Sequence, residues 1–311
     1  MRLSSARDNR TEYIPQTPQF NAGGFVQIYA FSKINLFLEI IGKRADGYHN
    51  LQSVMQSLEL CDDLHIGVAE GEGVYIELDK PVENFPLGNT NLITKAANAL
   101  LAEHKIQKQV TIKLHKRIPM GAGLGGGSSN CAATLHGLNK LLNLNLSLHR
   151  LIEIGGKLGA DVPFCLMGGT ALAEGIGEKL KGLPKRPHPP CHIAVACPNI
   201  HVSTAEMFAK LDLTDSPKSY ETFMEAYETG DIEKISQAIY NRFTPITAKI
   251  HPEITEIINH FKANGALNAE MTGTGSAVFA YFKDEKTAQA ACNKLNIPTF
   301  LTRPHQKGQP L

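Results

Sequence analysis

The stretch "PMGAGLGGGSSNCAATLHGL", residues 119–138, is the most unusual part of this sequence. Five of the seven positions 121–127 are glycine, two serines follow, and an apolar pattern of helical period begins immediately afterwards. Glycine has no Cβ and reaches positive φ, so successive backbone N–H groups can converge at the start of the helix, where they carry partial positive charge. The stretch therefore predicts a phosphate-binding loop. A flexible surface loop is disfavoured, because ordering each glycine costs about 0.5–1 kcal/mol of backbone entropy.

Three better-known glycine loops do not match this one. A Walker A loop requires a lysine before its Ser or Thr, whereas Ser128 follows a glycine. Gly121, Gly123 and Gly126 fit GxGxxG, but a dinucleotide site needs an acidic residue about 20 positions later, and residues 142–151 contain none. The HRD and DFG motifs of protein kinases are also missing from the sequence. The segment is thus a phosphate loop of another kind, and its serines could either cap the helix or contact a phosphate or metal.

Composition narrows the class of protein without naming it. The chain has 311 residues, 42% hydrophobic and 20% charged, with a net charge of +1, which is typical of about two globular domains. That charge balance gives no general attraction to nucleic acid or anionic lipid, so an anionic ligand must be held locally. Six scattered cysteines without a CxxC pair argue against zinc and disulfides. We therefore expect a cytoplasmic protein with no nucleic acid, membrane or obligate protein partner and no protein-held metal.

The first half of the chain alternates strands and helices around the glycine loop. Four short β-branched or aromatic segments predict strands, and the alternation of Val110, Ile112 and Leu114 predicts another. A helix over 89–104 would be capped by Asn89 or Thr90, and a second would run from a Ser147 cap to about Gly159. The four expected strands are 26–31, 34–41, 64–69 and 74–79.

The second half predicts a separate α/β unit. "PKRPHPP" at 184–190 marks the boundary, which divides the chain into an extension (1–26), an N-terminal domain (27–186) and a C-terminal domain (187–311). Ser203 and Glu206 fit a capping box, and Pro252 suits the first position of a helix with an apolar stripe. The elements expected around them are strands at 192–196, on both sides of 272–276 and at 298–302, and a helix at 284–294. Their order predicts a split βαβ, ferredoxin-like sandwich.

Four separated motifs, in the same order along the chain, resemble those of the GHMP kinases, a family of small-molecule kinases. They are "SKINLFLEIIGKRADGYHNL" (32–51), "PMGAGLGGGSSNCAATL" (119–135), "GADVPF" (159–164) and "MTGTGSAVFA" (271–280). The resemblance implies an α+β GHMP kinase fold, with an N-terminal ribosomal protein S5 domain 2-like domain and a C-terminal ferredoxin-like α/β sandwich. The implied activity is transfer of the ATP γ-phosphoryl group to the 2-hydroxyl of a cytidylylated methylerythritol, in the non-mevalonate route to isoprenoids.

The resemblance assigns the nucleotide to the glycine loop and to two residues outside it. Magnesium is expected with ATP, bound mainly by phosphate oxygens and water. Asn91 and Lys116 match positions that line the adenine pocket. The loop residues expected to bind ATP are Pro119, Met120, Gly121, Ala122, Gly123, Leu124, Gly125, Gly126, Gly127, Ser128 and Ser129.

The resemblance also implies a catalytic pair. Asp161 matches the family's base, which takes the proton of the acceptor alcohol, and Lys33 matches the lysine that stabilises the charge on the aspartate and the forming alkoxide. From the residues alone, Asp161 could be a turn residue and Lys33 a surface lysine, although the apolar surroundings of Lys33 favour a cleft. Phe31 and Ser32 stand where the family usually has Pro-Ala. Because 128 positions separate Lys33 from Asp161, the sequence alone does not show whether the two side chains meet.

A third set of residues is assigned to the acceptor substrate. The "DGYH" segment would place the His49 imidazole on the Watson–Crick edge of cytosine, and Tyr48 and Phe208 on its two faces, a stacking worth about 1–3 kcal/mol per base. The alternatives are a turn at Tyr48 and His49, a core position for Phe208, and a plain hairpin turn at 272–275. The residues assigned to substrate are Asn35, Tyr48, His49, Thr204, Phe208, Gly273 and Gly275.

Two rival functions stay open at this point. Another GHMP kinase would act on a mevalonate-like or homoserine-like alcohol, which the Tyr48, His49 and Phe208 set disfavours. A nucleotide-binding sensor without catalysis is disfavoured because both Lys33 and Asp161 are present.

Overall fold

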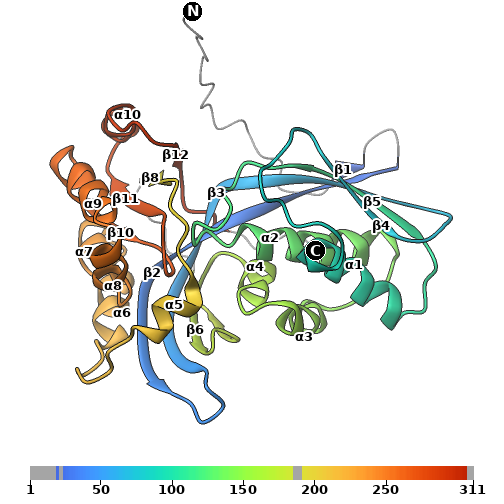
Figure 1. Cartoon of the computed structure of the whole chain (residues 1–311), viewed down its shortest axis with the longest axis horizontal. Helices are drawn as coiled ribbons and strands as arrows, with labels where there is room; N and C mark the ends of the chain where they lie inside the picture. The colour runs from blue at the N-terminus through green and yellow to red at the C-terminus, as the bar shows by residue number, and fades with distance from the viewer. Residues whose placement is uncertain (1–18, 21–23, 185–190, 307–311) are drawn as a thin grey trace, which may run out of the picture.

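Two β-sheets organise the part of the chain that the computed structural model describes, residues 19–20, 24–184 and 191–306 (Figure 1). The first sheet is dominated by a long antiparallel hairpin of its second and third strands, which runs through the molecule. Its strands are β1 (Gln19–Phe20), β2 (Val26–Lys43), β3 (His49–Ala69), β4 (Val74–Leu78), β5 (Gln109–His115), β6 (Thr170–Gly175), β7 (Lys179–Gly182) and β9 (Tyr240–Asn241).

Helices cover one face of this sheet, and the helix after the glycine loop lies at their centre. Inward-facing Ile66 and Ile112 pack in one core with Leu135 of α2. At Gly137 a Cβ would lie 2.6 Å from the Ile66 side chain, so the glycine lets α2 approach the strands closely. The elements on this face are a 3₁₀ turn η1 (Gly88–Thr90), α1 (Leu92–Glu103), α2 (Gly126–Leu141), α3 (Leu148–Leu158) and α4 (Val162–Met167).

The second sheet confirms the expected ferredoxin-like sandwich. Its strands lie in the order β10-β11-β8-β12, all antiparallel, which is the pairing of a βαββαβ unit. Ile254, Ile257 and Phe261 of the expected stripe are buried against it. Its elements are β8 (His192–Ala196), α5 (Thr204–Ala209), α6 (Tyr220–Thr229), α7 (Ile232–Gln237), α8 (Thr244–Ile250), α9 (Glu253–Ala263), β10 (Asn268–Met271), β11 (Val278–Phe282), α10 (Glu285–Asn293) and β12 (Thr299–Thr302).

The chain crosses between the two sheets more than once. β9 leaves the helical part of the second half and pairs in parallel with β2. After β12, residues 303–306 return to the first sheet, where Pro304 bridges Leu58 and the His305 amide donates to the Ser57 carbonyl at 2.7 Å. The His305 ring also stacks on Phe31 with 3.7 Å between centroids. Residues 185–190 of the expected boundary segment and most of the expected extension lie outside the described residues, so this division stays a prediction.

The structure corrects several expected boundaries. The strands expected at 26–31 and 34–41 are one continuous β2 with shifts of register. The cap of α1 is Asn91, whose side chain accepts from the Ile93 amide, and not Asn89 or Thr90. Pro252 precedes α9 instead of opening it. The caps expected at Ser147 and Ser203 are confirmed.

The helix after the glycine loop is not capped by a serine. Its N-cap is Gly125, which has φ 71° and lies in the left-handed region. Glycine has no side chain that could accept from the first amides of α2, so these amides are left for another acceptor. Among the described residues, no helix is long and apolar enough to cross a membrane.

A buried histidine makes the stability of this fold pH-dependent. Burial lowers the pKa of His136 on α2 from 6.5 to about 4. As pH falls, the imidazole takes up a proton in the unfolded chain before it does so in the folded chain. The stabilisation that is present above pH 6.5 is therefore lost as pH falls toward 4. We expect His136→Gln, which keeps a donor for the Leu166 carbonyl, to reduce the loss of unfolding free energy between pH 7 and pH 5 by about 2 kcal/mol.

Urea unfolding at the two pH values measures this difference. The control is His149→Gln, whose side chain is 84% exposed, and it should keep the wild-type dependence. An equal loss of stability in His136→Gln and the wild-type chain would contradict the prediction.

Candidate active site

The glycine loop borders a pocket of about 340 Å³ at the start of α2. Residues 119–128 all line it, together with Asn91 and Lys116. Gly121, Gly123 and Gly125 have φ between 66° and 80°, which side chains with a Cβ adopt only with strain. The amides of the first turn of α2 have no intrahelical acceptor, and Gly126, Gly127 and Ser128 of this turn line the pocket, so the loop is suited to bind a polyanion.

Three of the expected nucleotide residues also have structural partners. Lys116 donates to buried Asp62 at 2.6 Å and to the Ile118 carbonyl at 2.9 Å, and so holds the strand end that leads into the loop. Asn91 caps α1 and also donates to the Pro86 carbonyl. Ser129 is buried and donates to the Phe31 carbonyl at 2.6 Å, so its hydroxyl is turned away from the pocket.

The loop contacts the turn between β10 and β11 at very short range. A Cβ at Gly123 would lie 2.5 Å from the Thr272 carbonyl oxygen, and the Ala277 amide donates to the Ala122 carbonyl at 3.1 Å. Two glycine-rich segments from opposite halves of the chain therefore meet backbone to backbone. This contact requires glycine at position 123 for space as well as for its φ of 80°.

Two irregularities in β2 aim Lys33 into the same region. The register of β2 on β3 shifts between Phe31 and Lys33 and again between Asn35 and Phe37. Such shifts redirect side chains and commonly lie beside active sites. The stem of Lys33 packs against Gly125, where a Cβ would meet it at 2.9 Å, and its amide donates to the Leu124 carbonyl.

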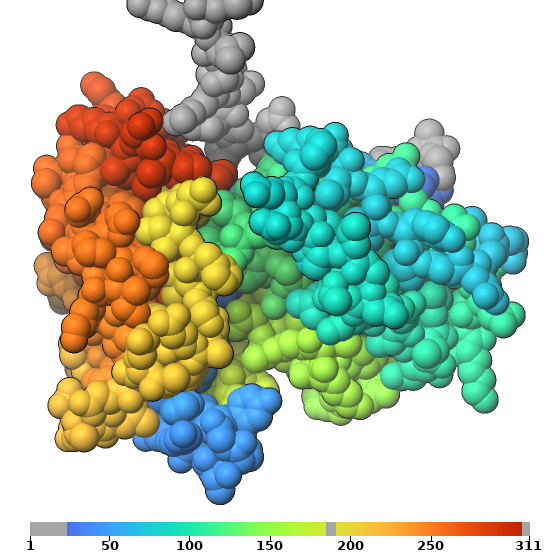
Figure 2. All heavy atoms as spheres, in the orientation of Figure 1, coloured from blue at the N-terminus to red at the C-terminus, as the bar shows by residue number. Residues whose placement is uncertain are grey.

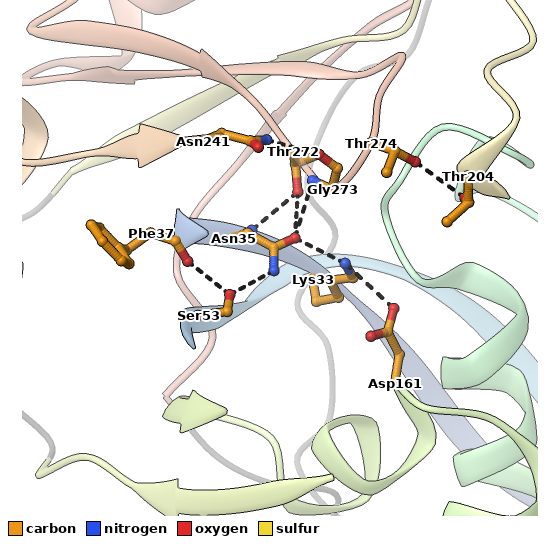
Figure 3. A network of polar contacts seen from close by, with 10 residues as sticks. All are labelled: Lys33, Asn35, Phe37, Ser53, Asp161, Thr204, Asn241, Thr272, Gly273 and Thr274. Atoms are coloured by element: carbon orange, nitrogen blue, oxygen red, sulfur yellow. Dashed lines mark hydrogen bonds and ion pairs between the residues drawn. The ribbon is translucent and has the colours of Figure 1, made fainter. Parts of the chain in front are cut away.

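Lys33 and Asp161 meet at this point (Figure 3). The Lys33 ammonium lies 3.4 Å from the Asp161 carboxylate and donates to the Asn35 side-chain oxygen at 3.0 Å. The Lys33 side chain is 6% exposed and the Asp161 side chain 39%. Asp161 precedes α4 but makes no capping hydrogen bond. Its carboxylate is therefore directed at the ammonium and at open space, and not at the local backbone as a simple turn residue would be.

Asn35 connects the pair to the other half of the chain. Its side-chain oxygen accepts from Thr272 at 3.2 Å and from the Gly273 amide at 3.1 Å, as well as from Lys33. Its amide nitrogen donates to Ser53 at 2.8 Å. With both polar atoms of a buried side chain engaged, Asn35 has one permitted orientation.

Sequence reasoning missed the residues that support this arrangement. Ser53 relays the Asn35 contact to the Phe37 carbonyl, and Asn241 on β9 donates to the Met271 and Gly273 carbonyls, each at 2.8 Å. Ser53 lies in a continuous buried run of β3, and Asn241 lies in a two-residue strand, so neither had a local pattern. Gly273 and Gly275 do lie in a hairpin turn, and that turn packs on the site.

A second pocket, of about 860 Å³, lies between the tip of the β2–β3 hairpin and α5, and we call it the hairpin-tip pocket. Tyr48, His49, Thr204 and Phe208 all line it, and so does Ala160, the neighbour of Asp161. Figure 2 shows the α5 segment (yellow) lying against the hairpin tip (blue). The pocket therefore adjoins the Lys33–Asp161 pair.

Its side chains suit a flat heteroaromatic ring. The rings of His49 and Phe208 are 5.1 Å apart, whereas Tyr48 is 61% exposed at the rim. Burial, and secondarily the Lys43 charge, lower the pKa of His49, so the imidazole is neutral near pH 7 and offers one donor and one acceptor. Thr204 contacts Thr274 of the turn at 3.1 Å between hydroxyl oxygens.

Among the described residues, no group of three or more His, Cys, Asp and Glu side chains could hold a metal ion.

A polyanion loop, a lysine–aspartate pair and an adjoining aromatic pocket define a small-molecule kinase, and comparisons with known proteins agree. The models for the GHMP kinases N terminal domain and the GHMP kinases C terminal match residues 91–169 and 223–298. The chain belongs to the GHMP kinase family. Both the expected family and its fold are confirmed. A mevalonate kinase from Methanococcus jannaschii, 18% identical with a TM-score of 0.70 over 92% of this chain and all of the other, shares the fold.

More similar relatives carry one particular name. The 4-diphosphocytidyl-2-C-methyl-D-erythritol kinase of Lachnoclostridium phytofermentans is 39% identical, over 89% of this chain and 97% of the relative. The kinase of that name from Carboxydothermus hydrogenoformans is 41% identical, over 90% and 97%. A crystal structure of 4-(cytidine 5'-diphospho)-2C-methyl-D-erythritol kinase has 30% identity and a TM-score of 0.76, over 89% of this chain and 98% of the other.

The Gly123 contact leads to a prediction. We expect Gly123→Ala to lower the unfolding free energy by about 3 kcal/mol and to weaken ATP binding, because the new methyl group strikes the Thr272 carbonyl. Gly121→Ala is the matched control, since Gly121 also has positive φ but a Cβ there would meet no atom within 4 Å. The control should cost about 1 kcal/mol. Denaturant unfolding and ATP titration measure both effects, and equal losses in the two variants would contradict the steric argument.

Proposed function

We propose that this chain transfers the γ-phosphoryl group of ATP to the 2-hydroxyl of 4-diphosphocytidyl-2-C-methyl-D-erythritol. The products are ADP and the 2-phosphate, and the step belongs to the non-mevalonate pathway of isoprenoid precursor synthesis. The observation that carries the proposal is the 3.4 Å distance between the Lys33 ammonium and the Asp161 carboxylate, which lie between the glycine-loop pocket and the hairpin-tip pocket. The names of the 38–41% identical relatives support the choice of acceptor.

In this proposal Asp161 is the general base. Its carboxylate takes the proton of the 2-hydroxyl as the oxygen's electron pair forms a bond to the γ-phosphorus, and the bond to the ADP oxygen breaks. The partial exposure of Asp161, and its freedom from capping, leave an oxygen available for an alcohol. Lys33 provides the positive charge beside the base and the developing alkoxide.

Asn35 would orient Lys33 and the sugar-alcohol end of the acceptor. Because its oxygen already accepts from Lys33 and the Gly273 amide, it fixes the ammonium relative to the turn at 272–275. Gly273 and Gly275 would form a backbone wall beside the acceptor and the phosphates. Alignment of this kind is what phosphoryl transfer requires most.

The glycine loop and the first turn of α2 would hold the ATP phosphates through backbone amides, with Asn91 and Lys116 beside the adenine. Ser128 lines the pocket, whereas the Ser129 hydroxyl contacts Phe31 and would contribute only through its place in the helix. Magnesium fits this proposal as an ion carried by the nucleotide, where it would neutralise the β and γ oxygens.

The hairpin-tip pocket would hold cytosine. A neutral His49 offers a donor and an acceptor to the Watson–Crick edge, Phe208 offers one stacking face, and Tyr48 at the rim would cover the other. Thr204 would face the diphosphate side. We place this activity in the cytoplasm, in accord with six free, buried cysteines, and it involves no nucleic acid, membrane or obligate protein partner.

A substrate panel tests the proposed function. In an ADP-release assay with ATP, we expect turnover with 4-diphosphocytidyl-2-C-methyl-D-erythritol. We expect none with mevalonate or homoserine, because neither has a nucleobase to occupy the hairpin-tip pocket. Turnover of mevalonate or homoserine instead would establish the rival GHMP kinase. ATP binding without ADP release on any of these alcohols would establish a sensor.

The catalytic role of Asp161 has a separate test. We expect Asp161→Asn to lower kcat by about 100- to 1,000-fold, because the amide cannot accept the proton, with ATP affinity nearly unchanged. Single-turnover kinetics and ATP titration measure the two effects. Glu285→Gln, which removes a carboxylate from α10, is the control and should keep full activity. Loss of ATP binding in Asp161→Asn would show that the carboxylate is structural.

A further inference from the structure

The hairpin-tip pocket has one wall without regular secondary structure. Residues 211–219, which connect α5 to α6, contain neither helix nor strand. Leu211 and Leu213 of this segment line the pocket together with Phe208. Leu211 packs against the core of the second sheet, whereas Leu213 is 36% exposed, so apolar contacts hold only part of the segment. Polar anchors hold the rest of this wall in place.

The first anchor is a fully buried carboxylate on β2. Glu39 has no solvent exposure, and its two oxygens accept from the Lys218 amide at 2.9 Å and from the Ile40 amide at 2.8 Å. The Arg242 guanidinium lies 3.8 Å from the same carboxylate. A buried carboxylate is costly unless it is paired and hydrogen-bonded, and here its partners include the far end of the 211–219 segment.

The second anchor is Arg242, which directly follows β9. Its amide donates to the Leu38 carbonyl at 2.9 Å, which places the residue beside Glu39 across the β2–β9 pair. Its guanidinium donates to the Asp212 carbonyl at 2.5 Å and lies 3.8 Å from the Asp215 carboxylate. A planar guanidinium presents its donors in a rigid fork, so it can serve the carboxylate and the carbonyl at once in a fixed geometry, whereas an ammonium is a single rotatable point charge.

Further contacts make the segment a compact unit between these anchors. Asp212 accepts from the amide and hydroxyl of Thr214, at 2.9 and 2.7 Å. The Lys218 ammonium lies 4.1 Å from the centre of the Tyr240 ring on β9. Both ends of the segment are thus attached to β2 and β9, the strands that also carry Asn35 and Asn241 of the active site.

We propose that Glu39 and Arg242 are positioning residues that hold residues 211–218 as a wall of the nucleoside pocket and so determine affinity for the cytidyl substrate. This proposal rests on the proposed function, since it takes the pocket to hold cytidine. The pair touches neither reacting group, so it acts on binding of the acceptor and not on transfer of the phosphoryl group. Without the pair, the leucine wall loses its fixed position, and ordering it becomes a cost of substrate binding.

The test compares binding of the two substrates in variants of this pair. We expect Arg242→Met to raise both the Kd for cytidine diphosphate and the KM for the acceptor about tenfold, while kcat and the KM for ATP change less than about twofold. Arg242→Lys keeps the charge but loses one of the two contacts, and should give a smaller rise. Leu213→Ser, on the wall itself and partly exposed, should raise the Kd without disturbing the buried carboxylate.

The control is Arg303→Gln, which removes an arginine–glutamate pair with α10 in the same half of the chain and should change neither constant. If the wild-type chain binds cytidine diphosphate and Arg242→Met and Leu213→Ser bind it equally well, the positioning proposal is overturned and the proposed function stands. If kcat and ATP affinity fall in parallel with acceptor affinity, the pair is merely structural, which also overturns it. Failure of the wild-type chain to bind cytidine diphosphate would overturn both proposals.

Discussion

The arrangement of this molecule depends on one buried carboxamide. The oxygen of Asn35 receives hydrogen bonds from the Lys33 ammonium, the Thr272 hydroxyl and the Gly273 amide. These donors belong to a strand of the first half and a turn of the second. Leaving any of them without an acceptor in a buried site costs about 1–3 kcal/mol, so the two halves are held in a single relative position where they meet. The same contact orients the cation that faces Asp161.

Around this contact, the two glycine-rich segments allow the backbones of the two halves to approach closely. The first lets the Thr272 carbonyl come within a distance that no Cβ would allow, and it accommodates the lysine stem at Gly125. The amides at the start of α2 remain available because the helix begins at a left-handed glycine and not at a capping side chain. The glycine-loop pocket, the Lys33–Asp161 pair and the pocket at the tip of the β2–β3 hairpin thereby become neighbours.

The sequence predicted what depends on local pattern. The glycine loop, the alternation in β5, the caps at Ser147 and Ser203 and the order of elements in the second sheet all follow from short-range chemistry. The family motifs singled out Lys33 and Asp161 as catalytic residues, but that their side chains meet is known only from the structure. What remained hidden depends on tertiary contact: the merging of two strands into β2 by shifts of register, the return of β9 to that strand, and the roles of Ser53 and Asn241. The possibility that a serine caps α2 was wrong for the same reason, because the Ser129 hydroxyl donates to the Phe31 carbonyl on a distant strand.

The repeated crossing of the chain between its sheets limits how the enzyme can exchange ligands. If the N-terminal and C-terminal halves moved apart, β9 would lose its pairing with β2. Residues 303–306 would also lose their contacts with Leu58, Ser57 and the Phe31 ring. Each of these is a backbone pairing or a ring stack, so clamshell motion is obstructed at several points at once. Under the proposed function, nucleotide and acceptor would then enter and leave through the rims of the two pockets, near Met120 on one side and Tyr48 on the other.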